Sequence, residues 1–594
     1  FDFDSTPGFT GTAVVNYTVA DDGCPGPAAT SAPATISLTV SGPVIWFVNS
    51  AGAAGNGTLS SPFNTLAAAA AVDAANHAIF LYTGTYSTGI TLNTGELLIG
   101  QGATGASFDA LFGITPPSGT IARPTIGGTR PTVQGTVALN ASSTVRGLNL
   151  TTGAATGLSG GAVVGVTVNE VSVTTTTGTT VTLNGTGGAL SFTALTSSGA
   201  STGLSLTSTS GSFTVTGDGT GRANGSGGSL SNSTFAAMTA LNSTGTISLN
   251  SMNFTITIAA NHGVLFDNNA GGALAGNIAG CTFTGVGGAA NVSQNKSMLQ
   301  FEAGGSANVT PNVQNSFFFN NRTYGFVATA AGTSIMNVTL NQSGFGTDVN
   351  TGAPVNQPGT TITNAPPFSA LVSTGSAAQV NYNITNNTFW GARGLDGALY
   401  AVTISGASTS GSLNGVFNGN KIGKAGVLGS GCANNCAGLG LLPGTGGTFN
   451  ATVSNNDIRQ VNAMAVNFVN SVTGANGTSI GKFINNTITE PDTTGAPLFQ
   501  RGIIVTPGNS GGATANWCAQ ITGNTVSGAW QAGSFIRVST LNTTGVLTLP
   551  GLTPLSGATG PQIDTFIEVA NAIGAGNSNA TVGGAINGSG SPCP

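Results

Sequence analysis

The stretch ITEPDTTGAPLFQRG places two carboxylates and one arginine close together along the chain: Glu490, Asp492 and Arg501. Two carboxylates that flank a glycosidic bond can act as general acid and general base in its hydrolysis. An arginine beside acidic Ca²⁺ ligands can instead serve as the base of an elimination. These three residues are therefore the candidate catalytic residues, and the chemistry would be cleavage of an acidic polysaccharide.

A second acid and base occur earlier in the chain, in SNNDIRQ, where Asp457 and Arg459 precede the first group by about one repeat. The competing interpretation is a surface ion-pair group that tunes a loop and contributes roughly 0–1 kcal/mol. The remaining acidic residues are scattered, and no DD or DxD occurs after Asp22. We favour the ion-pair interpretation and expect no catalysis.

Metal-ligand patterns in the chain are sparse. Asp21 and Asp22 offer the hard oxygen ligands that Ca²⁺ prefers, although a solvated turn is the favoured interpretation. In GCANNCAG, Cys432 and Cys436 lack the further soft ligands that a zinc site needs. We expect a disulfide there and no cofactor other than Ca²⁺ at the two aspartates.

A second disulfide can form near the C-terminus, between Cys518 and Cys593, although sequence does not establish the connectivity of the six cysteines. Disulfides indicate an oxidising, extracellular setting. The many Asn-x-Ser/Thr sequons make the chain a candidate glycoprotein.

The elements that must position these residues are short strands separated by Gly, Thr and Asn. A motif of apolar and Asn-rich polar residues recurs as ITNNTF, VSNNDI, FINNTI and ITGNTV, at irregular intervals that suit a parallel β-helix better than a propeller. The apolar residues that close the motif are expected to point inward; these are Phe283, Phe317, Phe345, Phe389, Ile422, Ile458, Ile488 and Val526.

Asparagine in this motif has a structural explanation. Asn tolerates the left-handed backbone of a tight bend, and stacked coils place its amide above the next one. We therefore expect an asparagine ladder at the turns, formed by Asn315, Asn387, Asn420, Asn456, Asn486 and Asn524.

Composition excludes several classes of function. Only 5% of the 594 residues are charged, against about 25% in an average soluble protein, and the net charge is −5. Without a basic cluster we expect no nucleic-acid binding. No apolar run reaches the roughly 20 residues of a membrane span. Because the chain begins at Phe1 without a signal peptide, we expect it to be a processed or partial form of a longer protein.

The N-terminal region divides at Pro43. In residues 1–42, GTAVVNYTVADD and ATISLTVSG alternate like half-buried strands, and two strands cannot bury a core by themselves. Residues 43–131 contain the strand VIWFV, a predicted helix in SSPFNTLAAAAAVDAA and three short strands. Residues 132–540 hold the coils, and 541–594 form a C-terminal cap with a short helix in PQIDTFIEVANAIG.

These segments resemble a known family. VIWFV, SSPFNTL, GTYSTG and LLIGQG are similar to the entry coil of right-handed parallel β-helix, pectin-lyase-like domains. RPTIGG, TVRGLNL and VNEVSVTTTTGT resemble very large secreted surface proteins of bacteria, in which such a helix follows immunoglobulin- or cadherin-like repeats. The resemblance implies an all-β fold with a capping helix, preceded by a partial β-sandwich.

We therefore expect an extracellular structural or adhesive solenoid, assembled as a cell-surface filament or surface layer. Residues 1–42 would complete a sandwich with another copy, which leads to head-to-tail self-association. Glycans or cell-surface ligands are further expected partners. The alternative is a polysaccharide lyase or hydrolase, or a glycan-binding β-helix, because the same scaffold hosts both roles.

Overall fold

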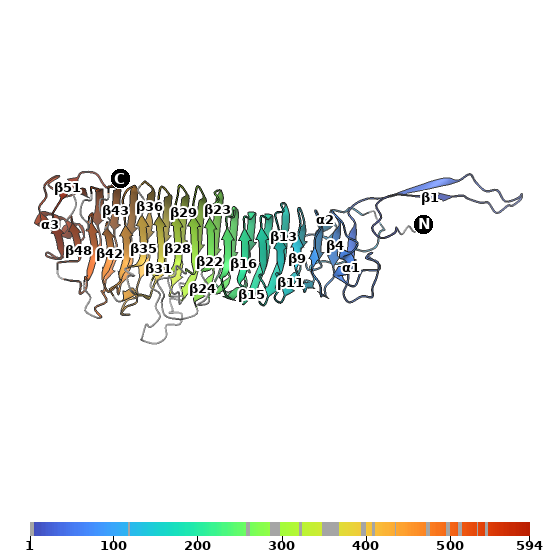
Figure 1. The fold of residues 1–594 in the computed structure, drawn as a ribbon, viewed down its shortest axis with the longest axis horizontal. Coiled ribbons are helices and arrows are strands. Elements are labelled where there is room, and N and C mark those ends of the chain that lie inside the picture. The colour runs from blue at the N-terminus through green and yellow to red at the C-terminus, as the bar shows by residue number, and fades with distance from the viewer. Residues whose placement is uncertain are drawn as a thin grey trace. The chain divides into compact units, whose positions relative to one another are not determined.

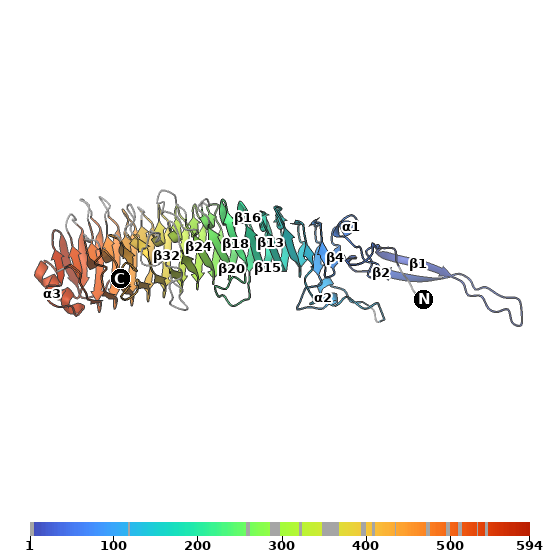
Figure 2. The same ribbon diagram turned by 90° about the horizontal axis from the view of Figure 1, so that it is seen from below.

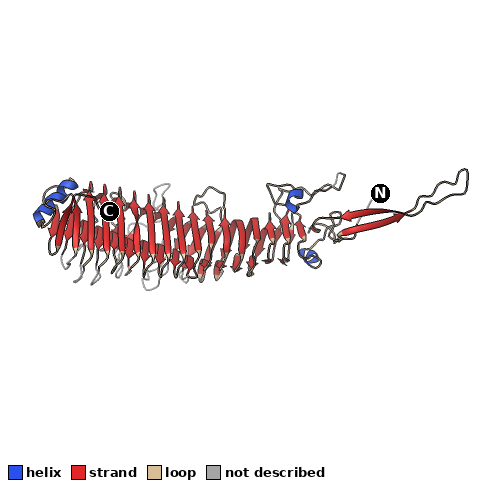
Figure 3. Cartoon of the chain, turned by 90° about the horizontal axis from the view of Figure 1, so that it is seen from above, coloured by secondary structure: helices blue, strands red, loops and turns tan. Residues whose placement is uncertain are grey.

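The computed structural model describes most of the chain as two compact units. The described residues are 5–116, 119–256, 262–285, 297–319, 324–346, 368–393, 400–406, 410–433, 435–470, 476–494, 499–508, 514–531, 533–540 and 545–594. Unit 1 comprises Phe1–Thr174 with Gly187–Ser191, and unit 2 comprises Thr175–Thr186 with Phe192–Pro594. Strands dominate both units (Figure 3).

Unit 1 begins with an antiparallel ribbon of two strands, β1 (Gly11–Tyr17) and β2 (Ala34–Val40). The two strands pair only with each other, so the described residues contain no complete β-sandwich. Both strands lie within the stretches that alternate in the sequence, and an isolated bridge joins Ala20 to Thr30 beyond the end of β1.

The rest of unit 1 contains three columns of parallel strands, which Figure 1 shows in blue to blue-green. The first column contains β3 (Ile45–Val48), β4 (Ala78–Leu81), β7 (Leu97–Gly100), β10 (Thr144–Arg146) and β13 (Val166–Thr175). The second contains β5 (Thr85–Tyr86), β8 (Thr132–Val133) and β11 (Asn149–Thr152). The third contains β6 (Ile90–Thr91), β9 (Val137–Leu139) and β12 (Leu158–Gly160).

The helix near the start of unit 1 is much shorter than the sequence predicts. Helix α1 spans only Leu66–Ala70, and its N-cap is Thr65, whose hydroxyl accepts a hydrogen bond from the Ala68 amide at 3.2 Å. Phe63 instead forms a parallel bridge with Val48. Because Phe63 is extended, the Ser-Pro signal before it cannot begin the helix.

A second helix of unit 1, α2 (Phe108–Phe112), was not predicted. Its two phenylalanines pack against Phe80 and Phe47, and the rings of Phe80 and Phe108 lie 5.2 Å apart. Gly113 ends the helix in the left-handed conformation, with φ of 61°. Figure 2 shows α1 and α2 beside the first strands.

Unit 2 repeats the three-column arrangement with longer strands. Its first column runs through β14 (Val181–Asn184), β16 (Thr202–Thr207), β19 (Ala236–Leu241), β22 (His262–Asn268), β25 (Leu299–Ala303), β28 (Tyr324–Ala330), β31 (Phe368–Thr374), β35 (Tyr400–Gly406), β39 (Ala437–Leu442), β42 (Met464–Val469), β45 (Arg501–Thr506), β48 (Ile536–Ser539) and β50 (Ser578–Thr581).

The second column of unit 2 comprises β17 (Ser210–Val215), β20 (Gly245–Asn250), β23 (Ala273–Ala279), β26 (Asn308–Gln314), β29 (Ile335–Asn341), β32 (Gln379–Thr385), β36 (Ser412–Asn418), β40 (Thr448–Ser454), β43 (Thr478–Ile484), β46 (Asn516–Thr522), β49 (Val546–Pro550) and β51 (Ala585–Ser589).

The third column of unit 2 comprises β18 (Ser229–Ser233), β21 (Asn253–Ile256), β24 (Thr282–Gly285), β27 (Phe317–Phe319), β30 (Gly344–Phe345), β33 (Thr388–Phe389), β37 (Lys421–Ile422), β41 (Asp457–Arg459), β44 (Thr487–Thr489) and β47 (Thr525–Val526). Strand β15 (Gly187–Ser198) contributes residues to both units, and β34 (Ala392–Arg393) pairs with β38 (Cys432–Ala433). The protein is therefore a parallel β-solenoid.

Stacked aromatic rings form the core beneath the third column. Phe283, Phe318 and Phe345 stack with ring separations of 4.7 and 4.6 Å. The inward residue of this coil is Phe318 rather than the predicted Phe317, because the register pairs Phe283 with Phe318. The stack continues through Phe389, 5.0 Å from Phe345.

The turn between the second and third columns assigns different roles to consecutive residues. Asn386 adopts the left-handed conformation, with φ of 56°, whereas the next residue, Asn387, is buried. The Asn387 backbone N–H and side-chain amide donate to Oδ1 of Asn420, at 2.9 and 3.0 Å. The same pattern continues through Asn456, Asn486 and Asn524.

The ladder extends beyond the asparagines of the motif. Before Asn387, the hydroxyls of Ser316 and Ser343 accept the equivalent backbone hydrogen bonds. Asn315 occupies the preceding left-handed turn position, with φ of 47°. At the other end, Asn524 donates to Oδ1 of Asn571, which is the C-cap of helix α3 (Gly560–Ala570).

Helix α3 lies within the C-terminal stretch where the sequence predicts a helix, and Pro561 occupies its first turn. None of the helices in the described part of the chain is long and apolar enough to cross a membrane.

Candidate functional site

The predicted catalytic constellation separates into three environments. Glu490 and Asp457 both pair with Arg459, at 2.7 and 2.6 Å. The pKa of Glu490 lies below its ordinary value because the Gly426 N–H, then Gln460 and Arg459, stabilise the carboxylate. This geometry is that of an ionised, partly exposed ion-pair group, in which Glu490 lacks the raised pKa that a general acid needs.

Asp492 belongs to a different environment. It is fully buried, and its Oδ1 accepts hydrogen bonds from the backbone and hydroxyl of Thr494, at 3.0 and 2.7 Å. Its other carboxylate oxygen is buried without a hydrogen-bond partner among the described residues. Asp492 therefore organises a local turn rather than sharing a charge pair with Glu490.

Arg501, the first residue of β45, lies apart from both acids. Its guanidinium sits over the ring of Phe499, 5.2 Å from the ring centre, and its Nε is buried without a hydrogen-bond partner among the residues described. Burial, and then the positive charge of Arg537 on β48, lower the pKa of Arg501. No carboxylate lies within 4.0 Å of either guanidinium in the described chain.

Arg501 and Arg537 form an arginine pair only in the sense that the charge of one lowers the pKa of the other, and an oxyanion bound between them would offset that repulsion. The neighbouring segments outside the described residues, 495–498, 509–513, 532 and 541–544, contain no Asp or Glu. Phe499, which is 53% exposed, adds an aromatic surface beside the pair. Sequence reasoning identified Arg501 but missed Arg537, because the two lie on neighbouring strands that are far apart in the sequence, and the register pairs Arg537 with Ile504 rather than with Arg501.

Another polar group on the first column was not predicted. Asp267 and Glu302 are in-register neighbours on β22 and β25, and desolvation, followed by the charge of Glu302, raises the pKa of Asp267. Gln300 donates to Glu302 and accepts from Ser297. The sequence signal that could have found Asp267 and Glu302 is their position on the outward face of strands that alternate between apolar and polar residues. Within the described residues, no three His, Cys, Asp or Glu side chains are grouped so as to hold a metal ion.

A pair of carboxyl groups, one buried and one half-buried, lies in unit 1. Glu96 is fully buried, and its Oε2 accepts a hydrogen bond from the Asn93 N–H at 2.6 Å. Burial, and then contact with the Asp73 carboxyl, raise the pKa of Glu96 to about 8. One oxygen of each carboxyl has no other partner in the described chain, so a shared proton would satisfy both.

The remaining predicted residues have structural surroundings. Cys432 pairs with Cys436, as expected, and Cys518 pairs with Cys593, a connectivity that the sequence left open. At the tip of the ribbon, Asp21 Oδ1 accepts from the Gly23 and Ala29 N–H groups and Asp22 Oδ1 from the Cys24 N–H. These hydrogen bonds show that both aspartates stabilise the turn at the tip of the ribbon. Binding of Ca²⁺ by Asp21 and Asp22 stays a prediction.

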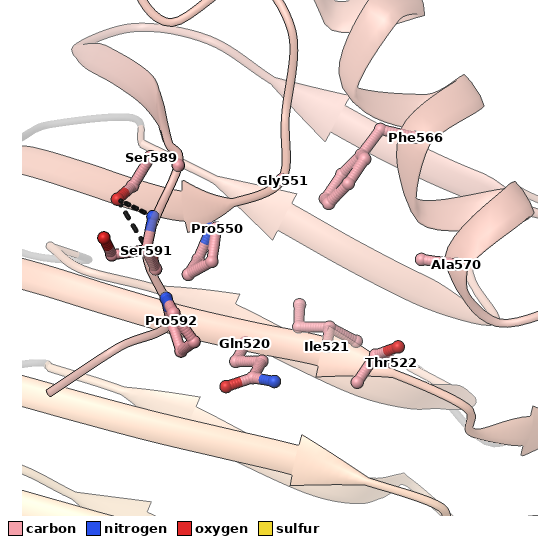
Figure 4. Close-up of a pocket in the computed structure, with 11 residues that line it drawn as sticks. Gln520, Ile521, Thr522, Pro550, Gly551, Phe566, Ala570, Ser589, Ser591 and Pro592 are labelled. Carbon is pink, nitrogen blue, oxygen red and sulfur yellow. Dashed lines mark hydrogen bonds between the residues drawn. The ribbon is translucent and has the colours of Figure 1, made fainter.

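A shallow cavity of about 280 Å³ lies in unit 2 between α3, β46 and the end of β51 (Figure 4). Phe566 reaches into it from α3, and Pro550 and Pro592 lie opposite. The Cys518–Cys593 disulfide ties the segment that contains Pro592 to β46. The lining carries no charge, so it suits a small neutral group.

The ribbon of β1 and β2 presents the most unusual surface of unit 1. One face carries half-buried apolar side chains, which are Ala13, Val15, Ile36, Leu38 and Val40. The opposite face carries Thr12, Asn16, Ser37 and Thr39 around Val14, which is 58% exposed. Both edges of the ribbon are unpaired among the described strands, and a two-stranded ribbon with an apolar face is only marginally stable by itself.

No protein-family model matches the chain, and no curated protein matches it either. The class of protein is thus defined by the fold: a parallel β-solenoid with a short β ribbon at its N-terminus.

Proposed function

We propose that the protein is an extracellular structural or adhesive solenoid, a subunit of a surface filament or surface layer, without catalytic activity. The proposal includes a right-handed coil, α1 as its capping helix and kinship with the large secreted surface proteins of bacteria. Residues 1–42 would be part of an immunoglobulin- or cadherin-like sandwich that a second copy completes.

The ribbon carries this proposal. Its two edges pair with no other strand in the described part of the chain, and the side chains of Val15, Ile36 and Leu38 lie on one face. Strands from a second copy would pair with the edges and cover the apolar row, as in strand complementation. If the strands come from another part of that copy, the contact is heterologous and repeats head to tail.

The test compares two adjacent valines on opposite faces of the ribbon. Val15→Asp places a charge on the apolar face, whereas Val14→Asp places the same charge on the exposed face. Sedimentation velocity and electron microscopy would follow the polymer length of the full chain. We expect shorter polymers for Val15→Asp and for deletion of residues 1–42, but not for Val14→Asp. Unchanged polymer length in all three would refute assembly through the ribbon.

The arginine pair favours a second candidate function, a glycan-binding or carbohydrate-active solenoid. Arg501, Arg537 and Phe499 supply a positive, aromatic-flanked surface that suits the carboxylate of an acidic sugar. Binding of acidic oligosaccharides that Arg501→Gln and Arg537→Gln each weaken would support the binding role. Release of new reducing or unsaturated ends, lost in Glu490→Gln or Asp492→Asn, would support catalysis.

A further inference from the structure

One surface of unit 2 is free of charge over eight consecutive coils. It is formed by the outward side chains of the second column from β17 to β40, and we call it the amide face. These eight strands contain no Asp, Glu, Lys or Arg; the first charged residue of this column is Lys482, in β43. The other columns do carry charges nearby, at Asp267 and Glu302 in the first and Lys421 in the third.

The side chains of the amide face form regular rows. Strand register aligns one row of side chains that are hydroxyls and amides except at Val416. The row consists of Thr214, Ser248, Asn277, Asn312, Thr339, Asn383, Val416 and Thr452. A second row lies two residues before it and includes Asn337, Asn381, Asn414 and Asn450. Figure 1 labels β23, β29 and β36 along this column, in which β26 and β32 lie between them.

Hydrogen bonds along the rows hold the amides in place. Asn381 donates to Asn337 at 2.9 Å, and Asn450 donates to Asn414 at 2.8 Å. One donated bond uses only part of an amide's capacity of two donors and two acceptor lone pairs. Asn381 and Asn383 are also exposed. The face therefore presents fixed donors and acceptors on a lattice with the strand spacing of about 4.8 Å.

The size of the amide face matches a stable protein contact. Eight strands at about 4.8 Å spacing, each about seven residues of 3.3 Å, cover on the order of 900 Å². Specific interfaces bury about 800 Å² on each partner. Charged residues ordinarily make up roughly 25–35% of a soluble surface and keep copies apart. They make up 5% of this whole chain, and the amide face carries none.

We propose that the amide face is a lateral contact between two copies of this chain, related by a two-fold axis. A surface with both donors and acceptors on one lattice is self-complementary under such an axis. Asn and Gln ladders are known to support contacts between stacked sheets, and the Thr methyl groups add apolar area. The role in a surface layer rests on the proposed function, but the contact uses residues that the ribbon does not contain.

The experiment places lysines on the face of the full chain. Asn381→Lys with Asn383→Lys introduces four like charges into the two-fold contact, whereas Thr255→Lys with Thr284→Lys adds the same charge on the third column. Sedimentation at micromolar concentration should show side-by-side pairs for the wild-type chain and the control. The test variant should raise the dissociation constant about tenfold or more, because like charges across an interface are repulsive.

The outcomes separate this contact from ribbon assembly. Val15→Asp should shorten head-to-tail polymers but leave side-by-side pairs, whereas the lysine pair should do the reverse. Thermal melting checks folding, and the near-isosteric pair Asn381→Asp with Asn383→Asp gives an independent test. Pairs that survive both substitutions would overturn the proposal. So would a wild-type chain that stays unpaired but is retained on an insoluble neutral polysaccharide, which would make the face a glycan surface.

Discussion

Replacing Asn456 by alanine tests whether the ladder stabilises the solenoid. Asn456 is 1% exposed, and its Oδ1 accepts from the backbone and side chain of Asn420, at 2.8 and 3.2 Å. Its Nδ2 donates to the Phe417 carbonyl and to Asn486 Oδ1, both at 2.9 Å. One buried side chain therefore makes four hydrogen bonds to neighbouring coils.

The expected loss of stability depends on which hydrogen-bonding groups Asn456→Ala leaves without a partner. Asn486 Oδ1 keeps the bond from the Asn456 backbone, and the Asn420 side chain keeps its bond to Ile384. The Asn420 N–H loses its acceptor, whereas the Phe417 carbonyl loses the Asn456 amide but stays in the strand pairing of β36 with β40. An unsatisfied buried group costs about 1–3 kcal/mol, so Asn456→Ala should lower the free energy of unfolding by about 1–3 kcal/mol.

The neighbouring Asn455 provides the control. Its φ of 56° suits glycine, and its side chain makes only an exposed bond to Asn418, so Asn455→Gly should change stability by less than about 0.5 kcal/mol. Asn456→Ser should be intermediate, because a serine hydroxyl fills this position at Ser316 and Ser343.

Hydrogen exchange of the Asn420 amide is the appropriate assay, because a solenoid opens locally and a global midpoint would dilute the effect. Denaturant titration of the same variants gives the free energy. Equal losses for Asn456→Ala and Asn455→Gly, or a loss below about 1 kcal/mol for the former, would refute the ladder reasoning.

Three further outcomes are expected. Since the raised pKa of Glu96 favours its protonated form when folded, the stability of unit 1 should be greatest below about pH 4.5 and fall toward about pH 8, and Glu96→Gln should flatten this dependence in melting curves. Replacing Cys518 and Cys593 together by serine should destabilise the C-terminal end by about 2–4 kcal/mol and speed its proteolysis; an unchanged cleavage rate would contradict this. Phe318→Ala should cost about 3–5 kcal/mol in denaturant titration, whereas Phe499→Ala, on an exposed ring, should cost little.

The repeat motif predicted the solenoid because its physics is local. Asn387, Asn420, Asn456, Asn486 and Asn524 could be read from the sequence, since a left-handed turn followed by a buried amide recurs in one short pattern. The serine and helix-cap rungs could not, because neither residue type marks a ladder. The same limit explains Phe317: three consecutive phenylalanines leave the inward position to strand register.

The candidate sites depended on contacts between distant parts of the chain. Glu490 and Arg501 are near in sequence, yet Glu490 pairs with Arg459 one coil earlier, whereas Arg501 is influenced by the charge of Arg537 on the next strand of its column. Glu96 and Asp73 carry no motif at all, and only the fold of unit 1 brings the two carboxyls together. Composition predicted that charges are few but could not show which surfaces lack them.

The rungs from Cys281 to Asn571 all donate in the same direction, each backbone N–H to the side chain of the next coil. Aligned hydrogen bonds polarise one another, so the ladder has a direction: its donors all point toward the C-terminal end, and its last acceptor is Asn571 at the end of α3. Under mechanical load, a pull that first detaches α3 removes that acceptor and leaves Asn524 with a bare donor. Unravelling from this end therefore exposes one new donor with each coil, which gives the solenoid a directional resistance to stretching.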